Sequence, residues 1–139
     1  MSPIIRNVLA VFLGWLGGSA VNMGLIQIGS SIYPIEGIDP TNMEALAKVM
    51  PTLTPEYFIY PFLGHALGTL VGAIIAGLIA ATNKMRFSLI IGVLFLLGGL
   101  IVNYLIPDPI WFTVLDLVVA YLPMGWLGGI LAIKMSGKK

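Results

Sequence analysis

Long apolar stretches separated by short polar segments dominate this chain. Four such stretches cover about residues 7–32, 55–82, 88–106 and 109–133. A helix that crosses a membrane needs roughly 20 mostly apolar residues, and each stretch reaches about that length. Small and polar residues gather on one face of each stretch at helical spacing, as they do in helices that pack together. The pattern predicts an all-α integral membrane protein, a four-helix bundle that forms one domain over residues 1–139.

Two short connections predict how these helices pair. About five residues, 83–87, join the second and third stretches, and the turn Pro107-Asp108-Pro109 joins the third and fourth. Helices joined by so few residues are antiparallel neighbours, so we expect two helical hairpins. Asp108-Pro109 also has the form of a helix start, because an N-cap side chain is followed by a proline in the first turn.

One sizeable polar segment remains, the loop over about residues 33–54. Its sequence Thr41-Asn42-Met43-Glu44 fits a capping box, and the apolar residues that follow share one helical face. We therefore predict a short amphipathic helix over about residues 42–50. This helix either rests on the membrane surface or on the bundle, or it forms a lid over a site that faces outward.

The order of the charged residues predicts the orientation. Six basic residues fall on one side of a four-span chain: Arg6, Lys84, Arg86, Lys134, Lys138 and Lys139. The other side holds Lys48 and five acids: Glu36, Asp39, Glu44, Glu56 and Asp108. Because lysine and arginine are enriched in cytoplasmic loops, we expect both termini in the cytoplasm and the long loop outside. A bacterial inner or plasma membrane is the expected location.

A cleavable signal peptide is the rival interpretation of the first stretch. Residues 8–16 have the length of a signal-peptide core, and Gly18-Ser19-Ala20 loosely resembles a cleavage site. However, the apolar run continues to Ile28, and only one basic residue, Arg6, precedes it. We therefore expect this segment to be retained as the first span.

The composition excludes several classes of protein. Hydrophobic residues make up 58% of the chain and charged residues 9%, whereas soluble domains are typically about 25% charged. A soluble globule, a disordered chain and a nucleic-acid binder with basic patches are therefore excluded. The absence of cysteine excludes disulfides, thiolate metal sites and cysteine nucleophiles. Nothing in the sequence implies a cofactor.

Small residues mark candidate packing faces. They recur every fourth position in the second stretch, a glycine-zipper pattern that lets another helix approach closely: Gly64, Gly68, Gly72, Ala76 and Ala80. The string Gly-Trp-Leu-Gly-Gly occurs twice and supplies two shorter pairs: Gly14 with Gly18, and Gly125 with Gly129. The two copies fall at similar depth, so we expect the first and fourth helices to cross there, unless the repetition is a coincidence of glycine-rich sequence.

Polar residues inside the spans form the candidate site. Counted inward at 1.5 Å per residue, His65 and Asp116 both lie about 10 Å from the outer ends of their helices. A charged aspartate near the bilayer centre costs about 2.5–3.5 kcal/mol, so Asp116 should face the interior and find a partner. We predict a His65–Asp116 pair, with its hydrogen bonds completed by one or more of four residues: Asn22, Thr69, Asn103 and Tyr121.

Three interpretations of this pair stay open. It holds the helices together, it handles a proton or another ion, or it belongs to a pocket for a lipid, a quinone or a small solute. One histidine, one aspartate and two asparagines make a poor ligand set for zinc or copper, so we expect no metal. Pro123, inside the fourth stretch, is either a static kink or a hinge between its two halves.

The sequence contains no recognisable catalytic motif, so we assign no catalytic residue and an enzyme ranks behind two other functions. The first is a small transport or channel-type protein that handles a proton, a cation or a small solute through the polar site. Because four helices enclose little volume, such a protein would be a homo-oligomer. The alternative is a non-catalytic binding or assembly subunit that docks a partner helix or a lipid on its glycine-rich faces. The bilayer is the one partner common to both.

Overall fold

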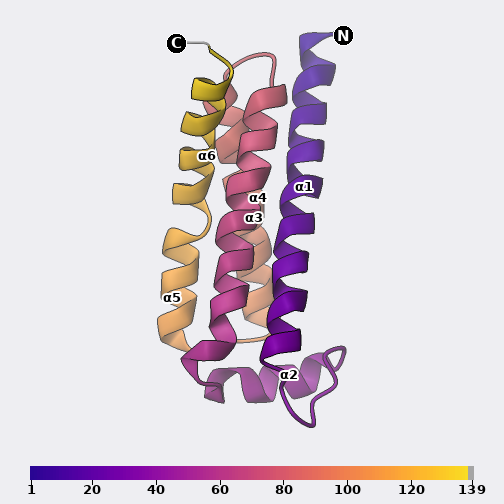
Figure 1. Cartoon of the computed structure of the whole chain (residues 1–139), viewed down its shortest axis with the longest axis vertical. Coiled ribbons are helices and arrows are strands. Elements are labelled where there is room, and N and C mark those ends of the chain that lie inside the picture. Colours follow the sequence, from indigo (N-terminus) through magenta and orange to yellow (C-terminus); the bar gives the residue numbers. More distant parts are fainter. Residues whose placement is uncertain (138–139) are drawn as a thin grey trace.

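The computed structural model describes residues 1–137, and its regular secondary structure over that range consists of helices alone. Its α-helices are α1 (Pro3–Ile32), α2 (Met43–Val49), α3 (Ile59–Ile79), α4 (Lys84–Leu105), α5 (Ile110–Val119) and α6 (Leu122–Met135) (Figure 1). Two short 3-10 helices, η1 (Met50–Thr52) and η2 (Pro55–Phe58), connect α2 to α3. Four segments are long and apolar enough to cross a membrane: Pro3–Ile32, Pro55–Ile79, Lys84–Leu105 and Ile110–Met135. The predicted all-α, four-span organisation is confirmed at this level.

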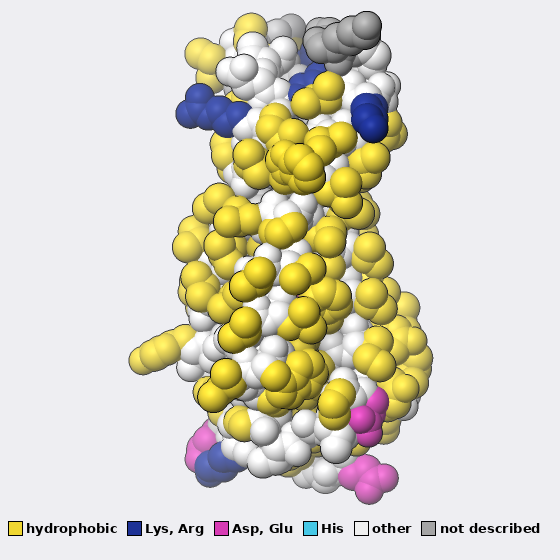
Figure 2. Space-filling model, turned by 90° about the vertical axis from the view of Figure 1, so that its left-hand side faces the viewer, with side chains coloured by type: hydrophobic (Ala, Val, Ile, Leu, Met, Phe, Trp, Pro, Cys, Tyr) yellow, Lys and Arg dark blue, Asp and Glu magenta, His cyan; other side chains and the backbone are white. Residues whose placement is uncertain are grey.

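The long helices lie side by side and give the molecule two distinct ends. The start of α1, the end of α6 and the α3–α4 connection lie at one end, and α2 crosses the other (Figure 1). We call these the terminal end and the α2 end. Most of the lysine and arginine side chains in view lie at the terminal end. Acidic side chains, with a basic one beside them, lie at the α2 end, and a broad apolar zone separates the two ends (Figure 2). Lys138 and Lys139 lie outside the described residues.

The structure has a helix in the long loop, but the cap of this helix differs from the prediction. The structure places α2 at Met43–Val49, within the predicted range. Asn42, not Thr41, is the N-cap, and its Oδ1 accepts a hydrogen bond from the Ala45 backbone N–H at 3.0 Å. The Thr41 hydroxyl instead donates to Asp39 at 2.7 Å. An asparagine side chain caps as well as a threonine does, so the capping-box prediction was wrong by one residue.

The first helix packs mainly on α3, not on the last span. A Cβ atom added to Gly72 would lie 2.6 Å from the Gly14 carbonyl oxygen, and one added to Gly68 would lie 2.8 Å from that of Gly18. The second copy of the repeated string packs elsewhere, because Gly125 lies against Gly92 of α4. The predicted crossing of the first and fourth helices is therefore wrong. Each glycine pair serves a different neighbour.

The fourth span is broken into two helices, whereas the sequence pattern predicted one continuous helix over about 109–133. Ala120 and Tyr121 separate α5 from α6, and Pro123 lies in the first turn of α6. A proline ring clashes with the carbonyl four residues earlier, which here belongs to Val119, the last residue of α5. Non-helical backbone at membrane depth is tolerated where protein covers it, and Tyr121 is only 1% exposed.

The start of the fourth span also differs from the prediction. Its N-cap is Pro109, and the carboxylate of Asp108 does not cap the helix. Asp108 instead accepts a hydrogen bond from Asn103 Nδ2 at 3.3 Å. The proline occupies the cap position itself, so the acid before it is free to bond back to α4.

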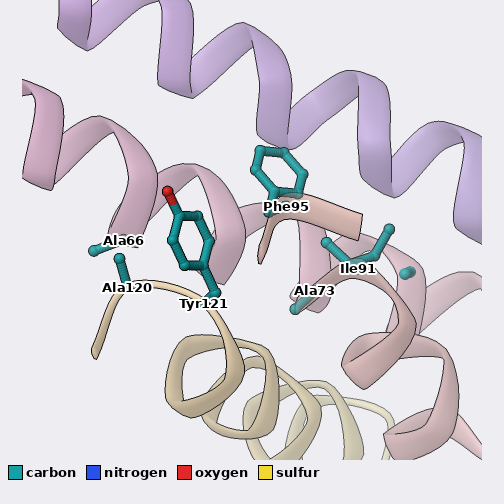
Figure 3. Packing of buried hydrophobic residues seen from close by; sticks show 7 residues of the cluster. Ala66, Ala73, Ile91, Phe95, Ala120 and Tyr121 are labelled. Atoms are coloured by element: carbon teal, nitrogen blue, oxygen red, sulfur yellow. The ribbon is translucent and has the colours of Figure 1, made fainter. Parts of the chain in front are cut away.

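The hydrophobic core lies where α3 and α4 meet the break in the fourth span. Its buried members are mostly small, which lets these elements approach closely: Ala66, Ala73, Ala76, Ile91, Phe95, Ala120 and Tyr121 (Figure 3). Tyr121 is the largest of the fully buried side chains. The core therefore centres on Tyr121, a large side chain of the fourth span that also has a hydroxyl group.

Side chains from two other helices close the terminal end of α3. The Arg6 side chain of α1 donates to the Ile79 carbonyl at 2.6 Å. The Lys84 ammonium group, at the start of α4, donates to the carbonyls of Gly77 and Leu78 at 2.9 and 3.1 Å. Cationic donors are favourable at a helix C-terminus, where the last carbonyls lack partners inside the helix.

Candidate functional site

The only histidine of the chain pairs with the only acidic residue of the fourth span. His65 Nδ1 of α3 lies 2.9 Å from both carboxylate oxygens of Asp116 on α5. When Asp116 is ionised its carboxylate only accepts hydrogen bonds, so in that state Nδ1 carries the hydrogen and donates it. The side chains are 18% and 7% exposed, respectively. The pair therefore lies largely out of contact with the surroundings of the bundle.

Tyr121 completes a hydrogen-bonded triad with this pair. Its hydroxyl donates to Asp116 Oδ2 at 2.8 Å. Its ring stacks on the His65 imidazole, with 5.8 Å between the ring centroids and 29° between the planes. We call His65, Asp116 and Tyr121 the polar triad. Tyr121 is also the residue at which the fourth span breaks, so the break and the site are parts of one structure.

Glycines on α4 make room for Tyr121. A Cβ atom on Gly99 would overlap the Tyr121 phenol, and a Cβ atom on Gly92 would lie 3.1 Å from the Tyr121 backbone carbonyl. Sequence reasoning did not assign either glycine to the site. The feature of the sequence that could have identified them is their spacing, which places both glycines on the same helical face as Asn103.

Three other predicted site residues do not bond to the carboxylate of Asp116. The Thr69 hydroxyl donates to the backbone carbonyl of His65 at 2.7 Å, a bond within α3. Asn103 donates to the Thr113 hydroxyl at 2.9 Å and so ties α4 to α5 nearer the α2 end. Of the four residues proposed to complete the pair, Tyr121 is the one that does so.

Asn22 lies at the α1–α3 interface, apart from the triad's hydrogen bonds. Its Oδ1 is buried and accepts no hydrogen bond from residues 1–137. A Cβ atom on Gly64 would lie 2.8 Å from this oxygen, and one on Gly68 would lie 2.9 Å from Asn22 Cβ. The two glycines therefore accommodate the asparagine, as Gly99 accommodates Tyr121.

The polar triad lies in the half of the bundle nearer the α2 end. His65 and Asp116 are each about 10 Å along the helix axis from the starts of α3 and α5. Within the described chain, the hydrogen bonds of the imidazole all run through Nδ1, which leaves Nε2 as a lone-pair acceptor in the neutral ring. A proton arriving at Nε2 would produce an imidazolium already paired with a carboxylate.

Asp108, in the connection between α4 and α5, is a second partly buried carboxyl. Burial raises its pKa above the ordinary value of 3.8, although the hydrogen bond from Asn103 acts in the opposite direction. The charge of Asp116 contributes to the upward shift, and His65 acts against it. The pKa of Asp108, which lies nearer the α2 end, therefore depends on the charge of the triad.

No group of three histidine, cysteine or acidic side chains that could hold a metal ion occurs in the part of the chain that the structure describes. The chemistry available in the triad is acid–base chemistry. It combines one imidazole, one carboxylate and one phenol in a chain of hydrogen bonds.

Comparison with known proteins gives no independent indication of function. No family model, no curated protein and no solved structure matches the chain. Any proposal for its activity therefore rests on the residues and their geometry.

Proposed function

We propose that this protein is a small membrane transport protein that takes up and releases protons through the polar triad. The observation that carries the proposal is a buried imidazole–carboxylate pair in which His65 Nδ1 contacts both oxygens of Asp116 at 2.9 Å. Ionisable side chains within membrane spans are costly and commonly mark ion pathways or proton relays. The fourth span also breaks at Tyr121, as helices do at the binding sites of many transporters.

Proton uptake changes the charge of the site by one unit. With neutral His65 and ionised Asp116, the triad carries a net charge of −1. A proton bound at Nε2 makes the triad neutral, and the imidazolium keeps its Nδ1–H bond to the carboxylate. A second cation that approached the same carboxylate would favour release of that proton, because like charges repel in a medium of low polarity. The triad can therefore couple proton release to the binding of a cation.

The alternative function of an assembly subunit has less support. Its docking surface was expected on the glycine-rich faces, but those glycines pack inside this chain. Gly14 and Gly18 face α3, and Gly125 and Gly129 face α4. A purely structural role for the triad would add little to the free energy of unfolding, because interhelical hydrogen bonds in membranes average about 0.6 kcal/mol each.

The proposal includes an orientation and an assembly state. The basic terminal end would face the cytoplasm and the acidic α2 end the outside of a bacterial inner or plasma membrane, in line with the positive-inside rule. The triad would then take up protons from the outer side. Because a four-span chain encloses little volume, we propose that several copies associate to form the complete path.

Proton movement in vesicles tests the proposal. Purified protein is reconstituted into liposomes that contain a pH-sensitive dye, and a pH gradient is imposed across their membrane. Na⁺, K⁺ or the organic cation phenyltrimethylammonium is then added outside, each in a separate experiment. We expect faster collapse of the gradient than in protein-free vesicles, with the extra rate lost in Asp116→Asn and His65→Gln. Thr69→Val is the matched control, because Thr69 is buried on α3 but bonds only to its own helix.

Two results would overturn this function. One is a wild-type rate equal to that of protein-free vesicles under every cation condition. The other is a wild-type rate that both triad substitutions leave unchanged. Circular dichroism and thermal melting of each variant verify that it is folded before its rate is interpreted.

A further inference from the structure

A pocket of about 360 Å³ lies beneath α2, at the acidic end of the bundle. We call it the α2 pocket. The last turns of α1 form one wall through Ile26 and Gly29, and Tyr33 follows directly after this helix. Leu46 of α2 and Met50 of η1 cover the pocket. Its volume falls within the usual range for small-molecule sites, roughly 300–1,000 Å³. Sequence reasoning anticipated a lid over an outward-facing site, but it did not identify this pocket.

Tyrosine rings stand in the wall of the α2 pocket. Tyr33 and Tyr57 both line it, with their ring centroids 6.0 Å apart and their planes inclined by 55°. Tyr60 extends the group, with its ring 6.5 Å from that of Tyr33. The electron-rich face of an aromatic ring attracts cations, and groups of such rings recognise quaternary ammonium compounds.

The charge around the α2 pocket favours a positively charged occupant. Glu36 and Asp39 lie in the loop segment whose Ile35 and Ile38 line the pocket. Hydrogen bonds from the backbone and side chain of Thr41 lower the pKa of Asp39, so this carboxyl stays ionised well below neutral pH. The basic residue of the loop, Lys48, is already paired with Glu44 at 2.8 Å. The loop that lines the pocket therefore carries a net negative charge.

The floor of the α2 pocket lies one helical turn from the polar triad. Pro61 lines the pocket and precedes His65 by four residues on α3, a spacing that places both on the same helical face. Ile26 also lines the pocket, and its side chain lies 3.4 Å from the position of a Cβ atom on Gly64, the residue before His65. A ligand in the pocket would lie between the α2 end and the buried carboxylate.

We propose that the α2 pocket binds a small hydrophobic organic cation, such as an aromatic or branched alkylammonium compound. Isoleucine, leucine and methionine side chains contact its apolar body, and the tyrosine rings and the surrounding carboxylates attract its charge. The further step, that this cation is the solute exchanged for the proton of the triad, rests on the proposed function. Binding to the pocket does not.

Equilibrium binding to the full-length protein in detergent tests the site. The probes are phenyltrimethylammonium and benzenesulfonate, which are similar in size and opposite in charge, with titration calorimetry as the readout. We expect binding of the cation only, weakened roughly three- to tenfold by Tyr33→Leu or Tyr57→Leu, as expected for the loss of one cation–π contact. Tyr104→Leu is the matched control, because this tyrosine at the same end is 86% exposed and does not line the pocket.

Two outcomes overturn the proposed site. One is equal affinity for the cation and the anion, or no binding of the cation at all. The other is unchanged affinity in both Tyr33→Leu and Tyr57→Leu. A third variant, Ile35→Trp, fills the pocket from its loop wall and should abolish binding, while thermal melting verifies its fold.

The two proposals fail in different ways. If wild-type protein binds phenyltrimethylammonium but moves no proton in vesicles, the pocket stands and the transport function falls. If protons move through the triad but no cation binds, the transport function stands and the pocket proposal falls. Asp116→Asn should retain cation binding and lose proton movement, because it alters the triad and leaves the pocket lining intact.

Discussion

His65 and Asp116, which are 51 residues apart in the sequence, meet with a 2.9 Å contact between Nδ1 and each carboxylate oxygen. They come from α3 and α5, so the contact fixes one half of the broken fourth span against the helix at the centre of the bundle. The same carboxylate accepts a hydrogen bond from the hydroxyl of Tyr121, which lies in the break itself. One buried acid therefore organises both the site and the local fold.

The first prediction concerns the energetic coupling of His65 and Asp116. Asp116→Leu leaves a buried imidazole and a buried phenol without their acceptor, and should lower the free energy of unfolding by about 1–3 kcal/mol for each of these two groups. The double variant His65→Leu/Asp116→Leu should lose less than the sum of the two single changes. Unfolding by sodium dodecyl sulfate in mixed micelles provides the measurement. Additivity within about 0.5 kcal/mol would show that the two residues are not coupled.

The second prediction compares two adjacent glycines of α4. Gly99→Val should displace the Tyr121 ring and lower the free energy of unfolding by about 1–3 kcal/mol, as overpacking does in other cores. Gly98→Val is the control, since no atom lies within 4 Å of a Cβ atom at that position. Thermal melting compares the two variants. If both have the same melting temperature, the space at Gly99 does not limit the position of Tyr121.

The third prediction concerns the contact between α1 and α3. Gly72→Ala places a methyl group 2.6 Å from the Gly14 carbonyl oxygen. That oxygen is backbone and cannot rotate away, so α1 must shift and stability should fall by about 1–3 kcal/mol. Gly24→Ala on α1 is the control, because its methyl group meets no atom within 4 Å. Denaturation in mixed micelles should separate the two, and equal stability would contradict the close approach.

The fourth prediction is a pH dependence at Asp108. Burial raises the pKa of this carboxyl in the folded protein, so the folded state binds the proton more tightly than the unfolded chain. Its contribution to stability is therefore fully present below pH 3.8 and is lost as the pH rises through the raised value. The difference in melting temperature between wild type and Asp108→Asn should change in that window. A difference that is constant with pH would show that Asp108 titrates normally.

The sequence predicted the helices far better than their contacts. The spans, the short connections and the loop helix follow from apolar length, polar boundaries and helical spacing, all of which are local. Which helices touch is not local. The repeated Gly-Trp-Leu-Gly-Gly string suggested one shared crossing, but Gly14 lies on Gly72 and Gly125 lies on Gly92. A small residue permits a close approach without specifying the partner.

The site was predictable in part because charge is scarce. One aspartate and one histidine at equal depth in a membrane have few other partners, so their proximity could be proposed from position alone. Asn103 and Thr69 share that polar layer, but each has a nearer partner, in Thr113 and in the His65 carbonyl. The break at Tyr121 was not predicted. Pro123 marks a disruption, but the two-residue gap depends on the space that Gly92 and Gly99 leave on α4.

The break gives the middle of the bundle an electrostatic direction of its own. Because α5 ends at Val119, its last carbonyl groups point toward the middle of the fourth span, close to Asp116. The C-terminus of a helix carries a partial negative charge, equivalent to roughly half an elementary charge. The first turn of α6, which begins at Leu122, places the opposite partial charge on the other side of the same break. A continuous helix has no such pair of charges at its middle, whereas the divided span sets a local dipole there, with its negative side toward Asp116.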